Sequence, residues 1–155
     1  MSGRLKEEIG KHRRFDSLEQ EVVLNLLRTA DALMREVELL LKPVGLSSTQ
    51  YNVLRILRGA GESGLSCGEV AQRMITHDPD MTRLLDRLEK RRLIARARQT
   101  DDRRVVKATI TGEGLQLLSG LDEPIRQLHQ TQLSHLGERK LGMLMKLLEA
   151  ARPRR

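Results

Sequence analysis

The stretch that decides the fold is residues 79–111, PDMTRLLDRLEKRRLIARARQTDDRRVVKATIT. Its first part has leucines at the spacing of one helix face: Leu84, Leu85, Leu88 and, after a turn, Leu93. Asp78 is typical of an N-cap, and Pro79 of a first helical residue, because proline lacks only an N–H that has no partner there. The sequence therefore predicts a helix that begins at Pro79, with one apolar face and one basic face.

Two short strands are predicted after this helix. Residues 94–98 alternate apolar and basic side chains, and residues 105–110 form the second strand. The polar segment 99–104 separates them and reads as a loop. A helix that runs into such a hairpin has the outline of a winged helix.

Positive charge is concentrated in the same part of the chain. From Arg83 to Lys107 there are ten basic and four acidic residues, a balance of +6, whereas the whole chain carries +7. This concentration is expected of a surface that contacts phosphates. A merely solvated helix with i,i+4 ion pairs is the alternative. It accounts for Asp86 beside Lys90, but not for the basic residues that continue through the hairpin.

These residues resemble the multiple antibiotic resistance regulator (MarR) family of winged helix-turn-helix transcription factors. Residues 80–94 resemble the family's recognition helix and the turn after it, and residues 65–74, LSCGEVAQRM, resemble the first helix of the helix-turn-helix. Asp102-Arg103-Arg104, followed by TGEG at 111–114, resembles the wing and the start of the next helix. The likeness extends more loosely over about residues 17–150.

Arg92 departs from the family pattern, because family members usually have glycine at this place in the turn. An arginine here must either tolerate the turn geometry or reshape it. It also adds a positive charge beside the expected DNA surface.

The expected fold is mainly α with a small β-hairpin wing. At 155 residues the chain is expected to form one domain, 1–155, and with Phe15 and Tyr51 as its aromatic residues the core must be aliphatic, which favours helix packing. The resemblance implies a winged helix-turn-helix at about 47–111, flanked by long dimerisation helices at about 17–42 and 112–151.

Capping patterns predict several helix starts: Ser17 with Gln20, Ser47 with Gln50, and Ser66 with Glu69. Residues 1–16 read as a weakly helical arm. Thr111 is expected to cap a helix that runs toward Leu121. Pro124 then predicts a kink or a break, with Asp122 able to cap a new start. A last amphipathic helix is expected at about 137–151.

The apolar stripes of the terminal helices are more than one small domain can cover, so we expect a homodimer. The candidate interface residues are Leu18, Val22, Leu136, Leu141, Leu144 and Leu148. For each of these leucines the alternative, a place in the core of a single chain, stays open.

Two copies related by a two-fold axis would set their recognition helices into successive major grooves of double-stranded DNA, about 34–36 Å apart, on a pseudo-palindromic site. The candidate DNA-binding residues are Asp80, Thr82, Arg83, Arg87, Arg91, Arg92, Arg98, Arg103 and Arg104.

These candidates have different expected roles. Arg83 can pair with guanine, whereas Asp80 either accepts from cytosine or caps the helix. Arg87, Arg91 and Arg92 are expected on phosphates. In the wing, either Arg103 or Arg104 would enter the minor groove while Asp102 braces the other.

The resemblance further implies a repressor that loses DNA affinity when a small, often phenolic, anionic ligand binds between the dimerisation helices and the winged module. The candidate polar lining residues are His12, Arg13, Tyr51 and Arg55. Cys67, the single cysteine, is either a packing residue or a redox switch, and it excludes an intramolecular disulfide.

Other functional classes fit less well. The histidines at 12, 77, 129 and 135 are scattered, no catalytic arrangement or glycine-rich phosphate loop is present, and no cofactor or metal is expected. A winged helix that binds RNA or protein is the main alternative, although RNA readers usually present aromatic platforms that this chain lacks. Without an apolar run of about 18 residues or a leader, we expect a soluble cytoplasmic protein.

Overall fold

The computed structural model describes residues 4–99, 102 and 104–152, and its elements are mainly helical. In chain order they are α1 (Leu5–Glu8), α2 (Leu18–Leu41), the 3₁₀ turn η1 (Lys42–Val44), α3 (Ser48–Ala60), η2 (Gly61–Ser63), β1 (Leu65–Ser66), α4 (Cys67–Arg73), α5 (Met81–Lys90), β2 (Ile94–Arg98), β3 (Val106–Ile110), α6 (Gly112–Leu133), η3 (Ser134–Leu136) and α7 (Gly137–Ala151). The expected fold class, mainly α with a small wing and long terminal helices, is confirmed.

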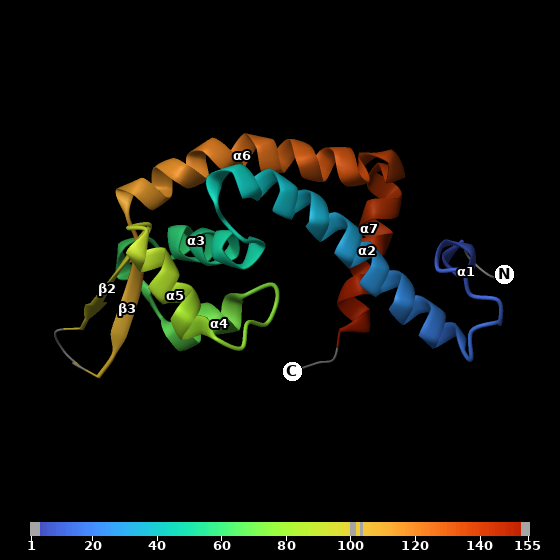
Figure 1. Cartoon of the computed structure of the whole chain (residues 1–155), viewed down its shortest axis with the longest axis horizontal. Helices are drawn as coiled ribbons and strands as arrows, with labels where there is room; N and C mark the ends of the chain where they lie inside the picture. Colours follow the sequence, from blue (N-terminus) through green and yellow to red (C-terminus); the bar gives the residue numbers. More distant parts are fainter. Residues whose placement is uncertain (1–3, 100–101, 103, 153–155) are drawn as a thin grey trace.

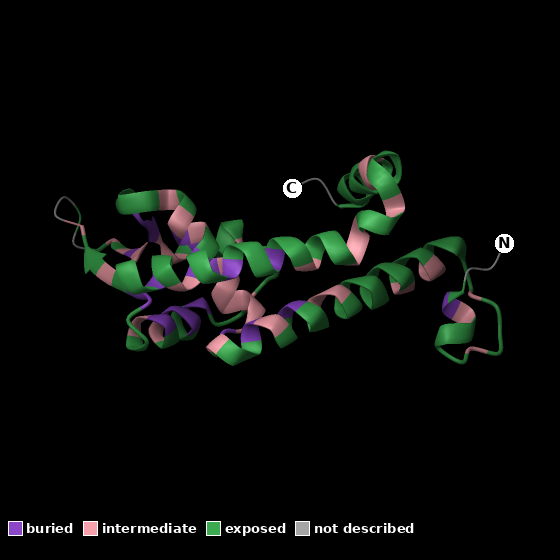
Figure 2. Ribbon diagram, turned by 90° about the horizontal axis from the view of Figure 1, so that it is seen from above, coloured by how far each residue is buried: buried purple, intermediate pink, exposed green. Residues whose placement is uncertain are grey.

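The molecule has a winged module at one end and long helices that extend away from it. Figure 1 shows α3, α4, α5 and the sheet grouped together, with α6 arching away from them above α2. Seen from above, α7 and α2 lie on opposite sides of α6 (Figure 2). None of the residues of α7 is buried. The last helix therefore stands away from the body of the chain.

The wing is part of a three-stranded antiparallel sheet in the order β1-β3-β2. The hairpin pairs Ile94 with Ile110 and Arg98 with Val106, so the two predicted strands are confirmed, the second starting one residue later than expected. The third strand, β1, pairs Leu65 with Ala108 and was not predicted from the sequence. A strand of two residues is too short to show an alternating pattern.

The core lies where α3, α4, α5 and the sheet meet the adjoining ends of α2 and α6, and Figure 2 shows most of the buried residues at this end. Its largest fully buried side chains are aliphatic, as expected: Leu41, Leu54, Leu57, Leu85, Leu88, Ile94, Leu118, Val53 and Val70. Packing of this kind stabilises the module through burial of apolar surface.

Two of the predicted capping boxes are complete. The side chains of Ser47 and Ser66 accept from the third helical N–H, and Gln50 and Glu69 accept in return from the capping residue's own N–H. At α2 only half of the box forms: Ser17 Oγ accepts from Gln20 N–H at 3.1 Å, but the Gln20 side chain accepts from the N–H of Asp16.

The predicted start of the recognition helix at Pro79 was wrong by two residues. The N-cap of α5 is Asp80, whose Oδ1 accepts from Arg83 N–H at 3.1 Å. Asp78 instead accepts from the N–H of Asp80 at 2.9 Å, in the turn before the helix. Asp80 is also acidic and directly precedes the buried Met81, so it caps the helix in place of Asp78.

Of the two outcomes predicted at Pro124, a kink or a break, the break was wrong, because α6 runs through it from Gly112 to Leu133. Proline removes the hydrogen bond to the carbonyl four residues earlier, here that of the exposed Gly120. Asp122 caps no new helix, because its carboxylate pairs with Arg58 of α3. The N-terminal arm forms one helical turn, α1, and Glu8 in it lies 3.0 Å from Arg28 Nε of α2.

Candidate nucleic-acid interface

The recognition helix α5 is fixed by its apolar side and exposes its basic side. Met81, Leu84, Leu85 and Leu88 are buried. The opposite face presents Thr82, Arg83, Arg87 and Lys90 to solvent. The helix therefore sits on the core with a polar, basic face directed outward.

Arg96 of β2 pairs with both acidic residues of α5. Its Nη2 lies 2.5 Å from Asp86 Oδ1 and 2.6 Å from Glu89 Oε2, and its backbone N–H also donates to Glu89. The hydrogen bonds that Arg96 donates to Glu89 raise the pKa of Arg96 above its ordinary value, and the bond that it donates to Asp86 adds to this effect. These contacts also join the wing to the helix.

The remaining cations of the module are mostly exposed and free of acidic partners. Within the described residues no ion pair involves Arg87, Lys90, Arg92 or Arg98. Arg83 lies 3.5 Å from Asp80 Oδ2, but its side chain is 71% exposed. Asp80 thus caps the helix, as one of the two roles expected for it requires, and lies beside Arg83. These cations form a surface that can contact polyanions.

Arg92 adopts the left-handed backbone conformation, with φ of 57°, and is the one non-glycine residue of the described chain that does so. Its N–H donates to Glu89 O at 2.8 Å and the N–H of Leu93 donates to Leu88 O at 3.1 Å, which is the Schellman pattern of a helix end. Thr111 Oγ1 also donates to Arg92 O at 2.6 Å. Arginine here tolerates the turn geometry that glycine would adopt and does not reshape it.

Arg91, the C-cap of α5, points back to the protein. Its Nη1 donates to Gly45 O at 2.5 Å and its Nη2 donates to Val44 O at 2.9 Å. Both carbonyls belong to the turn between α2 and α3. From the sequence Arg91 was expected on a DNA phosphate, and partners 46 and 47 positions away leave no local signal.

In the wing, Asp102 contacts Arg104: its Oδ1 accepts from the Arg104 N–H at 3.0 Å and lies 3.4 Å from Nε. The other candidate, Arg103, lies outside the described residues. Arg98 is exposed on β2, opposite Val106.

The predicted dimer residues divide into two groups. Leu18, Val22, Leu144 and Leu148 are exposed in the single chain, and Leu136 and Leu141 are half-buried. The same two helices expose further large apolar side chains that the sequence analysis did not select: Val23, Leu26 and Leu27 on α2, and Met143, Met145 and Leu147 on α7.

A cavity of about 700 Å³ lies along the C-terminal half of α2 and the start of α3. Its lining residues are Asp31, Met34, Arg35, Glu38, Leu39, Lys42, Gly45, Leu46 and Ser47. The candidates His12, Arg13, Tyr51 and Arg55 are not among them. Tyr51 and Arg55 contact each other on α3, where Arg55 Nη1 donates to Tyr51 Oη at 3.0 Å. His12 and Arg13 lie between α1 and α2, at the opposite end of the molecule (Figure 1).

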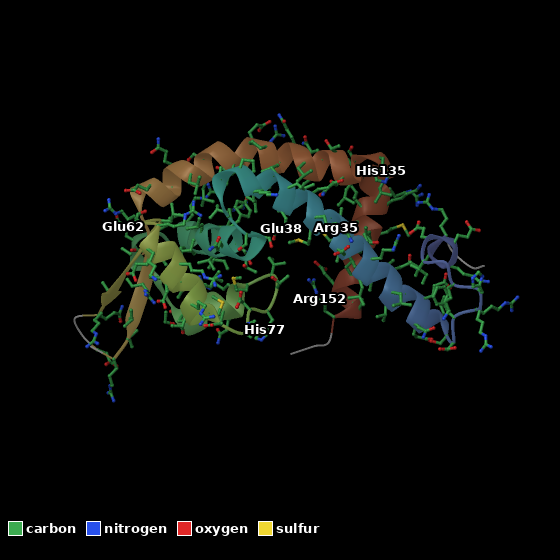
Figure 3. All side chains as sticks on the ribbon, in the orientation of Figure 1. Arg35, Glu38, Glu62, His77, His135 and Arg152 are labelled. Atoms are coloured by element: carbon green, nitrogen blue, oxygen red, sulfur yellow. The ribbon has the colours of Figure 1, made fainter. Side chains whose placement is uncertain are left out.

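The remaining candidates do not assemble into a reactive site. Cys67 is half-buried and packs against the core. Figure 3 places His77 on the loop before α5 and His135 at the far end of α6. Within the described part of the chain no three histidine, cysteine or carboxylate side chains are grouped as metal ligands, and no helix is long and apolar enough to cross a membrane.

Comparison with known proteins identifies this architecture. Residues 46–106 match the model of the MarR family. The HTH-type transcriptional repressor IacR of Pseudomonas putida is 31% identical over 124 residues, which cover 80% of this chain and 73% of IacR. The chain belongs to the MarR family. The segment that matches the MarR model runs from the turn after α2 into β3, so it contains α5 and nearly all of the basic face.

Solved structures of MarR proteins have the same fold. A MarR transcription factor from Planctomyces limnophilus is 44% identical, with a TM-score of 0.66 over 89% of this chain and 100% of the other. A mutant MarR from E. coli, complexed with operator DNA, is 24% identical with a TM-score of 0.77, over 89% of this chain and 100% of the other. At that identity the second likeness concerns the fold alone. This MarR-family chain is a transcriptional regulator with a winged helix-turn-helix.

Proposed function

We propose that this chain is a homodimeric repressor that binds a pseudo-palindromic operator through α5 and the wing, and that a small anionic ligand weakens this binding. The observation that carries the proposal is the charge on α5. Arg96 pairs with both acidic residues of the helix, whereas Arg83, Arg87 and Lys90 are exposed. A face with this charge fits the phosphates and base edges of a major groove.

Each exposed residue has a proposed role. Thr82 and Arg83, in the first turn of α5, would meet base edges, with Asp80 holding the helix start and the Arg83 side chain. Arg87 and Arg92 would contact phosphates, and Arg98 would follow the backbone beside the wing. Because Asp102 holds Arg104, Arg103 is the better candidate for the minor groove.

The exposed apolar faces of α2 and α7 support the homodimer. Leu18, Val22, Leu144 and Leu148 are between 36% and 71% exposed, although they are apolar. Large exposed apolar side chains of this kind are typical of an interface. The half-buried Leu136 and Leu141 would lie at its margin. In this proposal the whole chain acts as one domain, with α2, α6 and α7 joining the protomers and residues 47–111 reading DNA.

The cavity beside α2 is the proposed effector site, in preference to Tyr51 and Arg55. Three of its charges are already satisfied: Arg35 lies 2.6 Å from Asp31, and Glu38 accepts from the N–H of Ser48 at 2.9 Å. Figure 3 shows Arg35 and Glu38 on neighbouring turns of α2. Lys42 has no acidic partner within the described residues.

A ligand with an apolar body and a carboxylate suits this lining. Met34, Leu39 and Leu46 provide apolar surface, and the Lys42 ammonium can bind the carboxylate. Such a ligand weakens DNA binding only if it binds the DNA-incompetent arrangement more tightly than the competent one.

The proposal is tested by fluorescence anisotropy with a duplex selected from a random pool and a scrambled control, each titrated with salt. We expect the selected duplex to bind on the order of 10³-fold more tightly than the control, with a steep loss of affinity as salt rises. Equal and weak binding of both duplexes would contradict operator recognition. It would favour the alternative, a winged helix that binds RNA or protein.

A further inference from the structure

We propose that Arg91 is a positioning residue that joins the end of the recognition helix to the turn bordering the effector cavity. The inference rests on the proposed function, because it names the contact through which that cavity and the DNA-reading helix influence each other. It assigns Arg91 to the protein rather than to a DNA phosphate.

The geometry of the contact is specific to arginine. The two terminal nitrogens of Arg91 donate to two consecutive carbonyls, to Gly45 O at 2.5 Å and to Val44 O at 2.9 Å. A planar guanidinium provides this fork, whereas a lysine ammonium provides a single point charge. Within the described residues these are the only hydrogen bonds between residues 81–92 and residues 41–46.

The turn that Arg91 holds is also a wall of the cavity. Lys42, Gly45 and Leu46 are lining residues. Gly45 has φ of +66° and its N–H donates to Lys42 O at 3.0 Å, while Leu46 N–H donates to Leu41 O at 3.3 Å. A ligand that contacts Lys42 therefore contacts the peptide units whose carbonyls Arg91 binds.

The other end of the contact is equally well fixed. Arg91 lies between Leu88, which is fully buried, and the left-handed Arg92 that ends the helix. A shift of the turn can therefore be passed to the C-terminal end of α5 by Arg91. Coupling between two sites is reciprocal, so DNA bound on α5 must also change the turn.

The experiment measures amide hydrogen exchange by mass spectrometry in the full-length protein, free and bound to the selected duplex. The variants are Arg91→Ala and Arg91→Lys, which retains the charge. Arg14→Ala is the matched control, because Arg14 is exposed in the segment between α1 and α2, outside the proposed DNA-binding face, and has no ion pair within the described residues. Far-UV circular dichroism verifies that each variant is folded.

In the free protein we expect exchange at Gly45 and Leu46 to be about tenfold faster in both Arg91 variants than in wild type, because the charge-assisted hydrogen bonds are lost. Arg14→Ala should match wild type. On the duplex, wild type and Arg14→Ala should show slower exchange at residues 42–46, and the Arg91 variants should not. Equal exchange at these amides in Arg91→Ala and Arg14→Ala, free and bound, would overturn the proposal.

Two further measurements distinguish the proposed coupling from a phosphate contact by Arg91 and from a failure of the proposed function. If Arg91→Ala lowered the salt dependence of duplex binding by about one counterion, as expected for a lost phosphate contact, Arg91 would be on DNA and the proposal would be overturned. Benzoate serves as the effector probe: its weakening of duplex binding should be present in Arg14→Ala and absent in Arg91→Ala. Failure of wild type to bind any selected duplex would instead contradict the proposed function, while exchange in the free protein would still decide whether Arg91 holds the turn.

Discussion

Arg58 and Asp122 form a two-pronged ion pair between α3 and α6, with each guanidinium nitrogen 2.8 Å from its own carboxylate oxygen. The two residues are 64 positions apart in the sequence. The pair joins the winged module to the long helix that leaves it. The hydrogen bonds that Arg58 donates to Asp122 lower the pKa of Asp122 and raise the pKa of Arg58.

Removal of this pair should destabilise the protein slightly and in a pH-dependent way. Because Asp122 is 45% exposed and screened by water, we expect Asp122→Asn to lower the free energy of unfolding by only about 0.5 kcal/mol at neutral pH. An aspartate whose pKa is lowered in the folded state stabilises the protein at pH values above its unfolded pKa of about 4. This stabilisation is lost as the pH falls through the lower folded pKa. The difference between variant and wild type should therefore shrink in acid.

Urea unfolding at fixed protein concentration, from neutral pH down to acid, measures this difference. Glu123→Gln is the matched control, because Glu123 pairs only within its own helix, with Arg126 three residues on and Gln127 four residues on. A larger loss of unfolding free energy for Glu123→Gln than for Asp122→Asn would mean that the ion pair between α3 and α6 stabilises the fold no more than a pair within one helix.

Arg92→Gly should stabilise the fold. An L-residue in the left-handed region costs about 1–2 kcal/mol relative to glycine, part of which the greater freedom of glycine in the unfolded chain offsets, so a net gain of about 1 kcal/mol is expected. Arg92→Ala removes the same charge but keeps the Cβ, and it should show no such gain. Equal gains in both variants would assign the effect to charge and not to the backbone.

Gly114 lies where α6 begins, and a side chain cannot be accommodated there. A Cβ on Gly114 would lie 2.3 Å from Leu93 O and 2.7 Å from Ile110 Cγ1. Gly114→Ala should therefore cost about 1–3 kcal/mol of unfolding free energy, or more if the strand and helix cannot shift. Gly120→Ala, in the same helix with nothing within 4 Å, should instead stabilise by about 0.5–1 kcal/mol. Thermal denaturation of the two variants would contradict this account if they changed in the same direction.

Arg83 and Arg87 should affect DNA binding differently. Arg83→Ala should weaken the selected duplex by roughly 1–3 kcal/mol and relax the preference at one base pair in each half-site. Arg87→Ala should weaken selected and scrambled duplexes alike and reduce the salt dependence. Anisotropy with both duplexes distinguishes the two patterns, and the assignment of α5 as the reading helix would fail if both variants bound like wild type.

The interface proposal predicts a change of assembly state. The double substitution Leu144→Glu and Leu148→Glu would place two carboxylates in the proposed apolar contact. It should raise the dimer dissociation constant by at least about tenfold while the winged module stays folded. Ile75→Glu is the control, because Ile75 is 85% exposed and lies in the loop before α5. Sedimentation velocity over a concentration series should show dissociation only in the first variant. An unchanged dimer there would place the interface elsewhere.

Local features of this protein were determined by the sequence alone. The apolar spacing of Leu84, Leu85 and Leu88 predicted α5 and its buried face, and the capping boxes at Ser47 and Ser66 predicted the starts of α3 and α4. These signals involve residues no more than four positions apart. Backbone geometry places such neighbours in contact wherever the segment lies in the fold.

The tertiary structure alone decided which charges remain available on the DNA-reading face. Arg91 binds carbonyls 46 and 47 positions away, Arg58 reaches Asp122 across 64 positions, and Arg96 takes up both acids of α5 through the register of the wing. The same is true of β1, which exists only because β3 lies beside it. An arginine in a sequence carries its charge but not its partner, because the partner is set by how distant segments pack.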